Sequence, residues 1–453
     1  MLPEGFRKRM TPILGAEAES LFHALTEQEP VRAFRVTQKA HRADIPALLQ
    51  ELSPRPVPYE TDGYYFSGEG VGNTPAHHAG AIYVQDPGAM AALCAVDVPE
   101  HARVLDVCAA PGGKSSQALK HLKTGFLVSN EIVPSRAKIT VSNVERLGYT
   151  HAMVTCMDTD TLADLYEAYF DLVIVDAPCS GEGMFRKNGQ ALSEWSEEAV
   201  HHCAERQAYI LDRACRTVAS GGRLLYSTCT FSPEENELTV DAFLDRHPDF
   251  RLLAPHERTL PFTAPGLDLC YKHIKNPEFC RRFYPHIAPG EGQFFAVLER
   301  CETDDMQTIH YKNAVYVPPK ATASLLQDFI KDVFHTPSDL TLGMLGDRPI
   351  LIPSDLPVPP RGVFSAGVLL GELRGSILRP HHQLFSALGH ACRRQVNLSD
   401  SDPRLFAYLR GEEIGDTGED GFCAVLYEGM PLGGGKRTGG RVKNHYPKGL
   451  RRT

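Results

Sequence analysis

The sequence predicts an α/β protein built around a mainly parallel sheet. Between residues 96 and 300, short apolar runs alternate with helical patterns, which is typical of strands joined by crossover helices. Two of these runs, Leu172–Val175 and Arg223–Tyr226, end abruptly in small polar residues, as buried parallel strands do. A third run leads into a glycine-rich turn and a helix. An open sheet of this kind holds ligands at the carboxyl ends of its strands, so that edge is where a site is expected.

The composition is that of a chain of packed domains. Its 453 residues predict about three domains, at roughly 150 residues each. No apolar run approaches the ~20 residues of a membrane span, and no hydrophobic signal region opens the chain, so we expect a cytoplasmic protein without membrane contact. We expect a monomer. Twelve scattered cysteines without a CxxC pair argue against a zinc ribbon or a disulfide framework, and no bound metal is expected.

Residues 1–95 predict a small α+β module. Strands are expected at Val31–Val36 and Ala81–Val84. A short helix is expected at Ile45–Leu52, before a run containing three prolines. A second helix, Ala89–Cys94, is expected to start from Asp86-Pro87-Gly88.

Residues 96–300 predict the parallel sheet itself. Its first strand is Arg103–Val107, followed by a helix at Ser115–Leu122. Its second strand is Phe126–Ser129, followed by a helix from Pro134, because proline suits the first helical turn. The remaining elements are expected at Ala152–Thr155 (strand), Leu172–Val175 (strand), Glu197–Ala219 (helix), Arg223–Tyr226 (strand) and Phe294–Leu298 (an antiparallel closing strand).

After Cys301 the alternation stops. Residues 301–375 predict a small linking domain with one amphipathic helix, Thr322–Phe334. Residues 376–453 predict a second small module with a helix near Gln383–Ala391, a strand at Gly421–Leu426 and a basic tail. The net charge of the chain is −9, but the tail has no acid and carries seven cations: Lys436, Arg437, Arg441, Lys443, Lys448, Arg451 and Arg452.

Reactive residues follow the two buried strands of the core. Asp176 and Cys179 come just after one strand, and Cys229 comes just after the other. Because the carboxyl ends of parallel strands share one edge of a sheet, we expect the three side chains in one crevice. Two thiols and a carboxylate together favour covalent chemistry. Taken singly, each cysteine would be interpreted as a small buried apolar residue.

The turn after the first core strand, VLDVCAAPGGKSSQAL, predicts a cofactor site. Gly112 and Gly113 allow a ligand to approach backbone N–H groups at a helix N-terminus. An NTPase phosphate loop would need a glycine where Cys108 stands, so that interpretation is weak. Glu131 and Asp158 follow the next two strands, where such acids bind ribose hydroxyls and an adenine amino group. Either acid alone would be interpreted as a helix cap or a solvated loop residue.

Three motifs, CAAPGGK, DAPCSGEG and STCTFSPEEN, are similar to the signature motifs of the Nop/Sun family of RNA cytosine-C5 methyltransferases. The resemblance covers about residues 1–300, and GKRTGGRVKNHYPKGLR resembles the PUA-like RNA-binding end of the bacterial RsmF type. It implies a Rossmann-like class I methyltransferase sheet, an RNA-binding N-terminal module, and 16S ribosomal RNA or the small ribosomal subunit as partner. Thr37 departs from the pattern, since the family usually has Asn there.

The same resemblance implies a cofactor and roles for individual residues. S-adenosylmethionine would be held by Cys108, Ala109, Ala110, Pro111, Gly112, Gly113, Lys114, Glu131, Arg136, Asp158 and Asp176. Cys229 would be the nucleophile that adds to carbon 6 of cytosine, and Cys179 the product-releasing cysteine. Asp176 would either donate a hydrogen bond from its protonated form or bind the exocyclic amine.

RNA is expected to reach this site as single-stranded or locally opened chain, because the target base must leave its stack. Tyr446 is expected to stack on a base; the alternative is an unstructured tail after Gly433–Gly435. Lys187 would contact a phosphate or the base, or be an ordinary solvated lysine. The residues expected to bind RNA are Lys187, Lys436, Arg437, Arg441, Lys443, Lys448 and Arg451.

Three other functions stay open at this point. An RNA-binding ribosome-assembly protein without catalysis would not need both cysteines, Asp176 and the cofactor acids. A thiol hydrolase using Cys229 would need an activating histidine, and neither cysteine motif contains one. A methyltransferase acting on tRNA would share every feature of the core.

Overall fold

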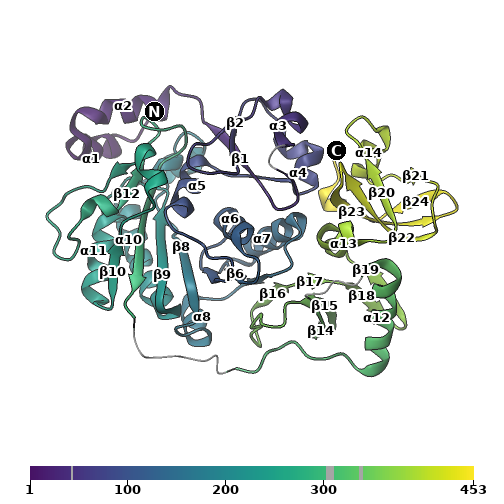
Figure 1. Ribbon diagram of the computed structural model, residues 1–453. Coiled ribbons are helices and arrows are strands. Elements are labelled where there is room, and N and C mark those ends of the chain that lie inside the picture. The colour runs from purple at the N-terminus through teal and green to yellow at the C-terminus, as the bar shows by residue number, and fades with distance from the viewer. Residues whose placement is uncertain (42–43, 303–310, 336–339, 453) are drawn as a thin grey trace.

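A computed structural model describes residues 1–41, 44–302, 311–335 and 340–452. Figure 1 shows a large sheet with helices on both faces, a small N-terminal sheet above it, and C-terminal modules on the opposite side from β9–β13. The large sheet has the strand order β11-β12-β13-β9-β8-β5-β6-β7-β16, with β10 paired to β13. Its strands are β5 Arg103–Asp106, β6 Phe126–Asn130, β7 Ala152–Thr155, β8 Phe170–Asp176, β9 Val218–Thr228, β10 Phe250–Leu253, β11 Ala264–Pro265, β12 Arg281–Phe283, β13 Gln293–Arg300 and β16 Val363–Ala366.

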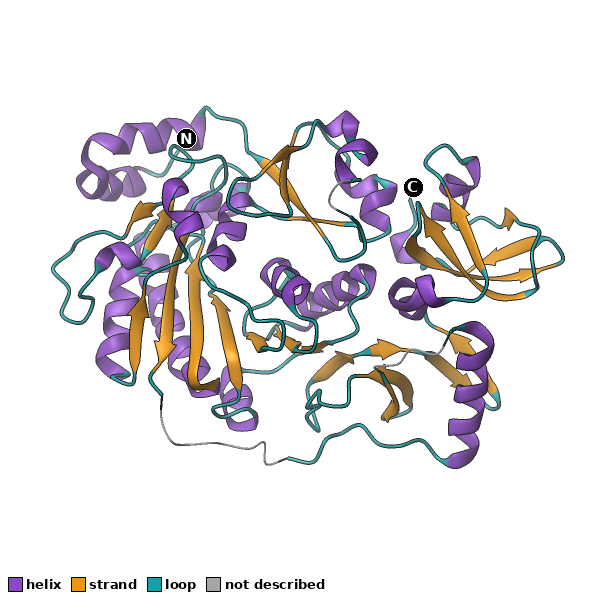
Figure 2. Cartoon of the chain, viewed as in Figure 1, coloured by secondary structure: helices purple, strands orange, loops and turns teal. Residues whose placement is uncertain are grey.

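The parallel part of this sheet, β9-β8-β5-β6-β7, confirms the predicted α/β class. Alternate residues of its strands feed two apolar cores, so that Leu105 packs on one face and Val104 on the other. The face of Val104 is covered by α5 Pro87–Cys94, α6 Gly113–His121 and α7 Pro134–Leu147. The face of Leu105 is covered by α8 Thr159–Leu165, α10 Glu197–Ala214 and α11 Glu237–Arg246 (Figure 2).

The predicted core strands are confirmed, and β13 is antiparallel to β9 as expected. The helix expected over Glu197–Ala219 was predicted too long, because it ends at Ala214 and β9 already begins at Val218. Gly221, with φ of 69°, lets the chain turn within β9 where an apolar helical pattern would otherwise continue. Helices α8 and α11 and strand β10 were missed. They are short, and sequence periodicity identifies short elements poorly.

The N-terminal module is an antiparallel sheet of order β2-β3-β1-β4 with a pair of helices beside it. The expected strands, helix 45–52 and the Asp86-capped helix are confirmed, although the first helix ends as a 3₁₀ turn. The helical pair α1–α2 was not predicted; its Phe6 packs on Phe185 and Phe231, which lie in the segments that follow β8 and β9. The elements are α1 Glu4–Leu14, α2 Ala18–Thr26, β1 Arg32–Val36, α3 Ile45–Leu48, β2 Arg55–Pro56, β3 Gly63–Phe66, α4 Pro75–His78 and β4 Ile82–Val84.

The C-terminal third forms several small sheets. The expected helices and strand are confirmed as α12, α13 and β22. The segment 363–366 leaves this region and pairs, as β16, with β7 of the large sheet. The remaining elements are α12 Lys320–Val333, β14 Thr341–Leu345, β15 Arg348–Ile352, β17 Val368–Leu369, β18 Gly371–Arg374, β19 Ile377–Pro380, α13 His382–Leu388, β20 Gln395–Leu398, α14 Pro403–Leu409, β21 Ile414–Gly415, β22 Gly421–Tyr427, β23 Met430–Thr438 and β24 Arg441–Asn444, with α9 Gly189–Glu194 in the core.

The basic stretch at the end of the chain is folded. Most of it forms β23 and β24 in the sheet β20-β22-β23-β24-β21, which rules out an unstructured tail between residues 436 and 452. The chain end returns to the N-terminal module, where His78 Nδ1 lies 2.8 Å from the Tyr446 hydroxyl. Within the described residues, no helix combines the length and the apolarity that crossing a bilayer requires.

Candidate active site

The two cysteines meet at the ends of neighbouring parallel strands. In the β8–β9 register Asp176 lies opposite Ser227, so Cys179 and Cys229 leave the sheet at nearly the same level. The two Sγ atoms are 3.1 Å apart, and the backbone N–H of Cys229 points to the Cys179 sulfur at 3.3 Å. Both thiols are free. The expected crevice is therefore present, with two thiols in contact.

The Cys179 thiol holds its proton strongly. Its hydrogen bond with Cys229 raises the pKa of Cys179 well above the ordinary value, and burial raises it further. Either sulfur can donate in this contact, and the raised pKa means that Cys179 keeps its proton more readily than a free thiol does. The hydrogen bond with Cys229 can raise the pKa of Cys179 only while the Cys229 sulfur is not bonded to another atom.

Asp176 lies beside the cysteines and faces the cofactor loop. Its Oδ2 is 2.8 Å from Lys114 Nζ, and its Oδ1 accepts a hydrogen bond of 2.7 Å from the Ser227 hydroxyl. Lys114 is 5% exposed and Asp176 is 37% exposed, so a buried cation is paired with a carboxylate that reaches the surface. The pair joins the cofactor loop to the strand end that carries Cys179.

Two buried carboxylates hold the cysteine loops together, and sequence reasoning missed both. Glu235 accepts from the Ser180 backbone N–H at 2.9 Å, and its other oxygen lies 2.5 Å from the Ser180 hydroxyl. Glu182 accepts from the Thr230 hydroxyl and the Phe231 N–H, each at 2.9 Å. The Ser180 and Thr230 hydroxyls are 2.7 Å apart. Each carboxylate therefore fixes the residue that follows one cysteine, and the hydroxyls link the two loops.

The cofactor loop, residues 108–114, lies between β5 and α6 beside the cysteines. Gly112 has φ of 107°, a conformation that favours glycine, and it turns the loop into α6. Asn143 Nδ2 donates to the Pro111 carbonyl at 2.9 Å, and Arg136 donates to the Ala110 carbonyl at 3.0 Å. Helix α7 thus holds the outer side of the loop. Cys108 lies inside it, and burial raises the pKa of its thiol.

Asp106, the last residue of β5, was also missed. Its Oδ2 accepts from the Ser115 hydroxyl at 2.7 Å, while its buried Oδ1 has no hydrogen-bond partner in the described part of the chain. Burial is the main cause that raises the pKa of Asp106 to about 7. An orphaned carboxyl oxygen at the mouth of a glycine turn is the kind of group that a polar ligand satisfies.

The two acids expected to bind a cofactor follow the next strands of the sheet. Glu131 comes after β6, where its Oε1 accepts from the Val133 N–H at 2.9 Å and its Oε2 lies 3.3 Å from Arg136. Asp158 comes after β7 and caps α8 by accepting from Thr161 N at 2.7 Å. That backbone hydrogen bond is the main reason the pKa of Asp158 lies below its ordinary value. The helix-cap interpretation of Asp158 is therefore correct as far as Oδ1 is concerned.

The sheet order arranges these groups in one row. Moving from β9 through β8, β5 and β6 to β7, the strand ends carry Cys229, then Asp176 and Cys179, then the loop 108–114, then Glu131, then Asp158. The thiols occupy one half of the edge and the cofactor acids the other. This donor set, with the orphaned Asp106 oxygen and the open glycine turn, fits a nucleoside that carries a charged amino-acid tail.

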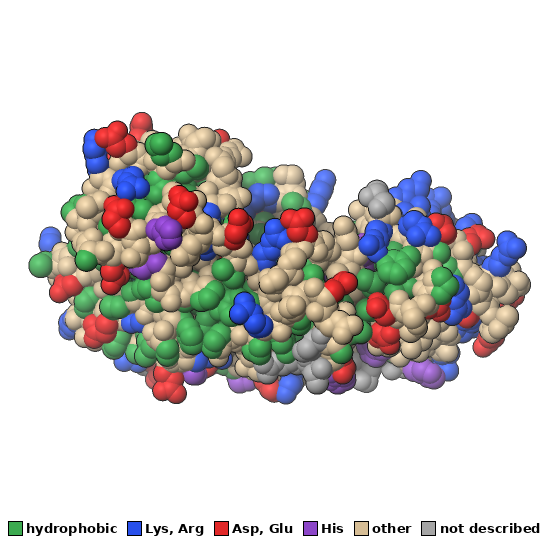
Figure 3. Space-filling view, turned by 90° about the horizontal axis from the view of Figure 1, so that it is seen from above, with side chains coloured by type: hydrophobic (Ala, Val, Ile, Leu, Met, Phe, Trp, Pro, Cys, Tyr) green, Lys and Arg blue, Asp and Glu red, His purple; other side chains and the backbone are tan. Residues whose placement is uncertain are grey.

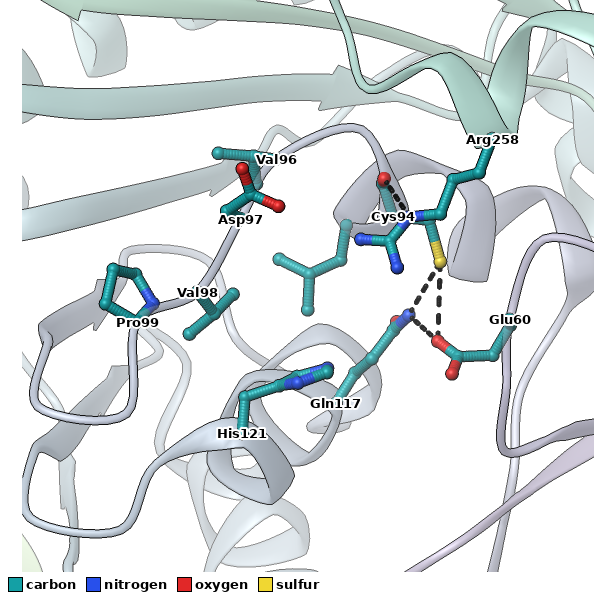
Figure 4. A pocket seen from close by; sticks show the side chains of 10 residues that line it. Glu60, Cys94, Val96, Asp97, Val98, Pro99, Gln117, His121 and Arg258 are labelled. Carbon is teal, nitrogen blue, oxygen red and sulfur yellow. Dashed lines mark hydrogen bonds between the residues drawn. The ribbon is translucent and has the colours of Figure 1, made fainter.

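Helix α6, which begins in the cofactor loop, is anchored to the N-terminal module at a cavity of about 230 Å³. In Figure 4, Gln117 of α6 points to Glu60, and Cys94 of α5 points to the same carboxylate. Gln117 donates to Glu60 Oε2 at 2.6 Å, and the Cys94 thiol donates to it at 3.4 Å. In the same network, Gln85 donates to Gln117 at 3.1 Å and Arg35 donates to the Gly113 carbonyl at 3.0 Å. The N-terminal module thereby positions the helix that opens the cofactor site.

Three family models together match most of the chain. A model described as 16S rRNA methyltransferase RsmB/F matches residues 93–299. The N-terminal domain of 16S rRNA methyltransferase RsmF matches residues 2–87, and the methyltransferase RsmF PUA domain matches residues 395–452. A ribosomal RNA small subunit methyltransferase F from Aeromonas hydrophila is 30% identical over 99% of this chain and 97% of its own length.

The chain belongs to the RsmF family of small-subunit ribosomal RNA methyltransferases. Other RsmF relatives show the same full-length match: the proteins of that name from Klebsiella pneumoniae and Vibrio cholerae are each 29% identical over 99% of this chain. Among solved structures, a methyltransferase homologue from Pyrococcus horikoshii is 26% identical with a TM-score of 0.58, covering 66% of this chain and 95% of that one. The Rossmann-like core is thus shared well beyond the RsmF family.

In this RsmF-family chain, three of the residues expected to meet RNA are engaged elsewhere. Arg437 is 4% exposed and forms a short ion pair with Asp416. Tyr446 is 2% exposed and packs edge-on against His382, so it has no free face for a base. Lys187 lies 2.8 Å from Asp86 Oδ2 and 3.3 Å from Glu291 Oε1, so its ammonium is paired with two carboxylates while its side chain is 25% exposed. These side chains hold the fold together.

Proposed function

We propose that this chain forms 5-methylcytosine in small-subunit ribosomal RNA, with S-adenosylmethionine as methyl donor and Cys229 as nucleophile. The observation that carries the proposal is the contact of 3.1 Å between the Cys179 and Cys229 sulfurs, beside Asp176 and the cofactor loop. Covalent addition to C6 needs one thiolate, and release of the product needs a base close to the same carbon atoms. Two touching thiols supply both.

The proposed cofactor residues act by position. Glu131 binds the ribose hydroxyls and Asp158 the adenine amino group, while the loop 108–114 and the free Oδ1 of Asp106 take the amino-acid tail. Bound in this way, S-adenosylmethionine supplies an electrophilic methyl group to the half of the strand edge that carries the thiols.

The thiols act in a fixed order. Cys179 holds its proton, while the Cys229 thiol loses its proton to solvent and adds to C6 of cytosine as the thiolate. A C–S bond forms and an electron pair moves to C5, which takes up the methyl group, with S-adenosylhomocysteine as the leaving group. Once the Cys229 sulfur is bonded to carbon, the main cause that raised the Cys179 pKa is gone. Cys179 can then lose its proton to solvent, and the resulting thiolate accepts the C5 proton. The C5–H electron pair restores the C5–C6 double bond and expels the Cys229 thiolate.

Asp176 has the second of the two roles considered from the sequence. A carboxylate paired with Lys114 and accepting from Ser227 is an acceptor group, so we assign it to the exocyclic amine of cytosine. That contact selects cytosine over uracil, which has an oxygen at this position. RNA phosphates are assigned to the exposed cations Lys436, Arg441, Lys443 and Lys448 and to Arg451.

The two cysteine variants test the proposal. Purified small-subunit RNA and S-adenosylmethionine are incubated with Cys229→Ala or Cys179→Ala enzyme and resolved by denaturing electrophoresis under reducing conditions. Cys229→Ala should give neither methylation nor adduct. Cys179→Ala should accumulate RNA attached through a C–S bond, which thiol reductants do not cleave, because attack proceeds and release does not.

Several outcomes would contradict the proposal. An adduct in Cys229→Ala instead of Cys179→Ala would exchange the two roles. Methylation of tRNA but not of ribosomal RNA by the wild-type enzyme would favour the tRNA alternative. RNA binding without methyl transfer to any RNA would indicate a ribosome-assembly protein.

A further inference from the structure

A groove of about 870 Å³ runs between the hairpin β18–β19 and the C-terminal sheet. The hairpin side presents Arg374, Ile377 and Arg379, and the sheet side presents Phe422, Lys443 and His445. The hairpin, residues 371–380, lies outside the residues 395–452 that match the PUA family model. The groove is therefore a composite of two modules, and the PUA module alone does not contain it.

The charge of this composite groove is the reverse of that of the whole chain. The chain has a net charge of −9, yet six lining residues are Lys or Arg and a single one is acidic, Glu372, which pairs with Arg374 at 3.1 Å. Arg379, Lys443 and Lys448 have no side-chain ion pair or hydrogen bond within the described residues, and all three are exposed. Figure 3 shows Lys and Arg side chains gathered at the C-terminal end of the molecule.

The cations converge on the groove. Burial lowers the pKa of His445, and the nearby charges of Arg379, Lys443 and Lys436 lower it further. Cations of the hairpin and cations of the sheet therefore both act electrostatically on His445. An anion with several charges in a row is the ligand that such a site favours.

An aromatic ring lies among the cations of the groove. Phe422 is half-buried, with its ring centroid 6.0 Å from that of His445 and 5.6 Å from that of Phe329, and the Lys436 ammonium lies 5.4 Å from it over one face. Ile377 is 69% exposed at the tip of the hairpin. Cations beside an aromatic face are the arrangement that binds single-stranded nucleic acid, because phosphates meet the cations while an unpaired base stacks on the ring. In duplex RNA the bases are paired and stacked on one another, so no base is available to stack on Phe422.

We infer that this groove binds an unpaired segment of the RNA substrate, with phosphates on Arg379, Lys443 and Lys448 and a base on Phe422. The inference rests on the proposed function for the choice of RNA as substrate. It adds a second binding region to the cysteine site, with which it shares no residue. An acidic protein segment is the competing occupant, and it would use the cations without the ring.

Binding of a labelled single-stranded RNA 12-mer to the full-length protein tests the inference. The triple variant Arg379→Ala/Lys443→Ala/Lys448→Ala should weaken binding at low salt and reduce the slope of log Kd against log salt by about 2, at roughly 0.7 for each phosphate that is no longer neutralised. The matched control, Lys312→Ala/Lys320→Ala/Lys331→Ala, removes three exposed charges outside the groove and should leave the slope unchanged. Phe422→Leu should weaken binding about fivefold or more while keeping the slope.

A slope that is equal in the triple variant and the control would overturn the inference, as would tighter binding of a 12-bp RNA duplex or of an acidic peptide than of the single strand. Phe422→Leu is interpreted only at unchanged Tm, and Phe422→Tyr, which keeps a stacking face, should restore binding. Direct binding requires no methyl transfer. A failure of the proposed chemistry would therefore appear in the cysteine variants, whereas a failure of this inference would appear in the salt slopes.

Discussion

Glu235, Ser180, Thr230 and Glu182 form a chain of four side chains that crosses behind the cysteine pair. Its three links, at 2.5, 2.7 and 2.9 Å, each need one proton, and the two hydroxyls supply two. The third proton is available if Glu235 is protonated and donates to Ser180. Burial is the main cause that raises the pKa of Glu235 to about 7, in agreement with this count. The loops that carry the two thiols are thus joined by a chain that is complete when Glu235 is neutral.

Glu235→Gln should keep the chain and remove its titration. The glutamine N–H₂ can donate to Ser180 while its oxygen accepts from the Ser180 N–H and from Gln207. In the wild type the folded state binds more protons than the unfolded state between the unfolded pKa of about 4.5 and the folded value of about 7, so stability is full below 4.5 and falls as pH rises through 7. The free energy of unfolding of the variant relative to wild type should rise by up to about 3 kcal/mol across that window.

Unfolding measured at pH 4.5, 6 and 8 checks this expectation. Asp106 also has a pKa of about 7, but it is present in both proteins and cancels in the comparison. A stability difference that does not change with pH would show that Glu235 is ionised throughout.

Glu131→Ala should weaken cofactor binding selectively. Loss of charged hydrogen bonds to two ribose hydroxyls costs about 1.5–3 kcal/mol, or roughly ten- to a hundredfold in Kd. Calorimetry with S-adenosylhomocysteine measures the loss, and binding of the RNA 12-mer should stay within twofold. Unchanged cofactor affinity would remove Glu131 from the site.

At the scale of elements, helix α11 and strand β12 are joined by one buried ion pair. Arg282 Nε lies 2.6 Å from Glu237 Oε1, and a second guanidinium nitrogen donates to the Phe231 carbonyl at 2.7 Å, just after Cys229. Both side chains are at most 2% exposed, and the carboxylate raises the pKa of Arg282. The pair therefore supports the segment that follows the nucleophile.

Removing one member of this pair should destabilise the core more than removing both. Arg282→Met leaves the Glu237 carboxylate buried without its cation, at a cost of about 3–5 kcal/mol. The double variant Arg282→Met/Glu237→Leu buries no charge and should recover part of the lost Tm. Thermal unfolding of the two single variants and the double variant gives the coupling; additive losses would show that the two residues act independently.

At the scale of the whole molecule, Lys39 donates hydrogen bonds to three parts of the chain. Its Nζ lies within 3.1 Å of the Ala79, Arg146 and Pro431 carbonyls and of the Ser386 hydroxyl. These acceptors belong to the N-terminal module, to α7 and to the C-terminal region. Burial lowers the pKa of Lys39 well below its ordinary value, because the four acceptors carry no full charge to offset desolvation.

Lys39→Met should loosen the C-terminal sheet from the core while each part stays folded. The acceptors lose a shared donor, so we expect a lower Tm and faster limited proteolysis of the full-length protein. Methylation should fall mainly through a higher KM for RNA, because Lys39 does not touch the cysteine site. Equal proteolysis rates for variant and wild type would show that other interactions hold the parts together.

The sequence predicted the residues whose position follows from a strand end. Asp176, Cys179 and Cys229 meet because β8 and β9 are neighbours, and both strands have a readable apolar pattern. Glu235 and Asp106 were not predicted, since their importance depends on burial and on partners such as Ser180, which is 55 residues from Glu235. Gly433–Gly435 resemble a flexible linker but form the middle of β23, where a side chain at Gly434 would meet the Phe385 ring at 2.2 Å. Close packing of a backbone against a ring leaves no signal in local periodicity.

Strand β16 means that the large sheet can be completed only late in translation. β7 ends at Thr155, but the strand that covers its outer edge is synthesised about two hundred residues later, as Val363–Ala366. On a ribosome that adds roughly 5–20 residues per second, the backbone N–H and C=O groups at the outer edge of β7 stay unpaired for about ten to forty seconds. A fragment ending near residue 300 would keep the cysteines and the cofactor loop and never close the edge. We expect such a fragment to aggregate during translation, and co-expression of residues 301–453 to rescue it.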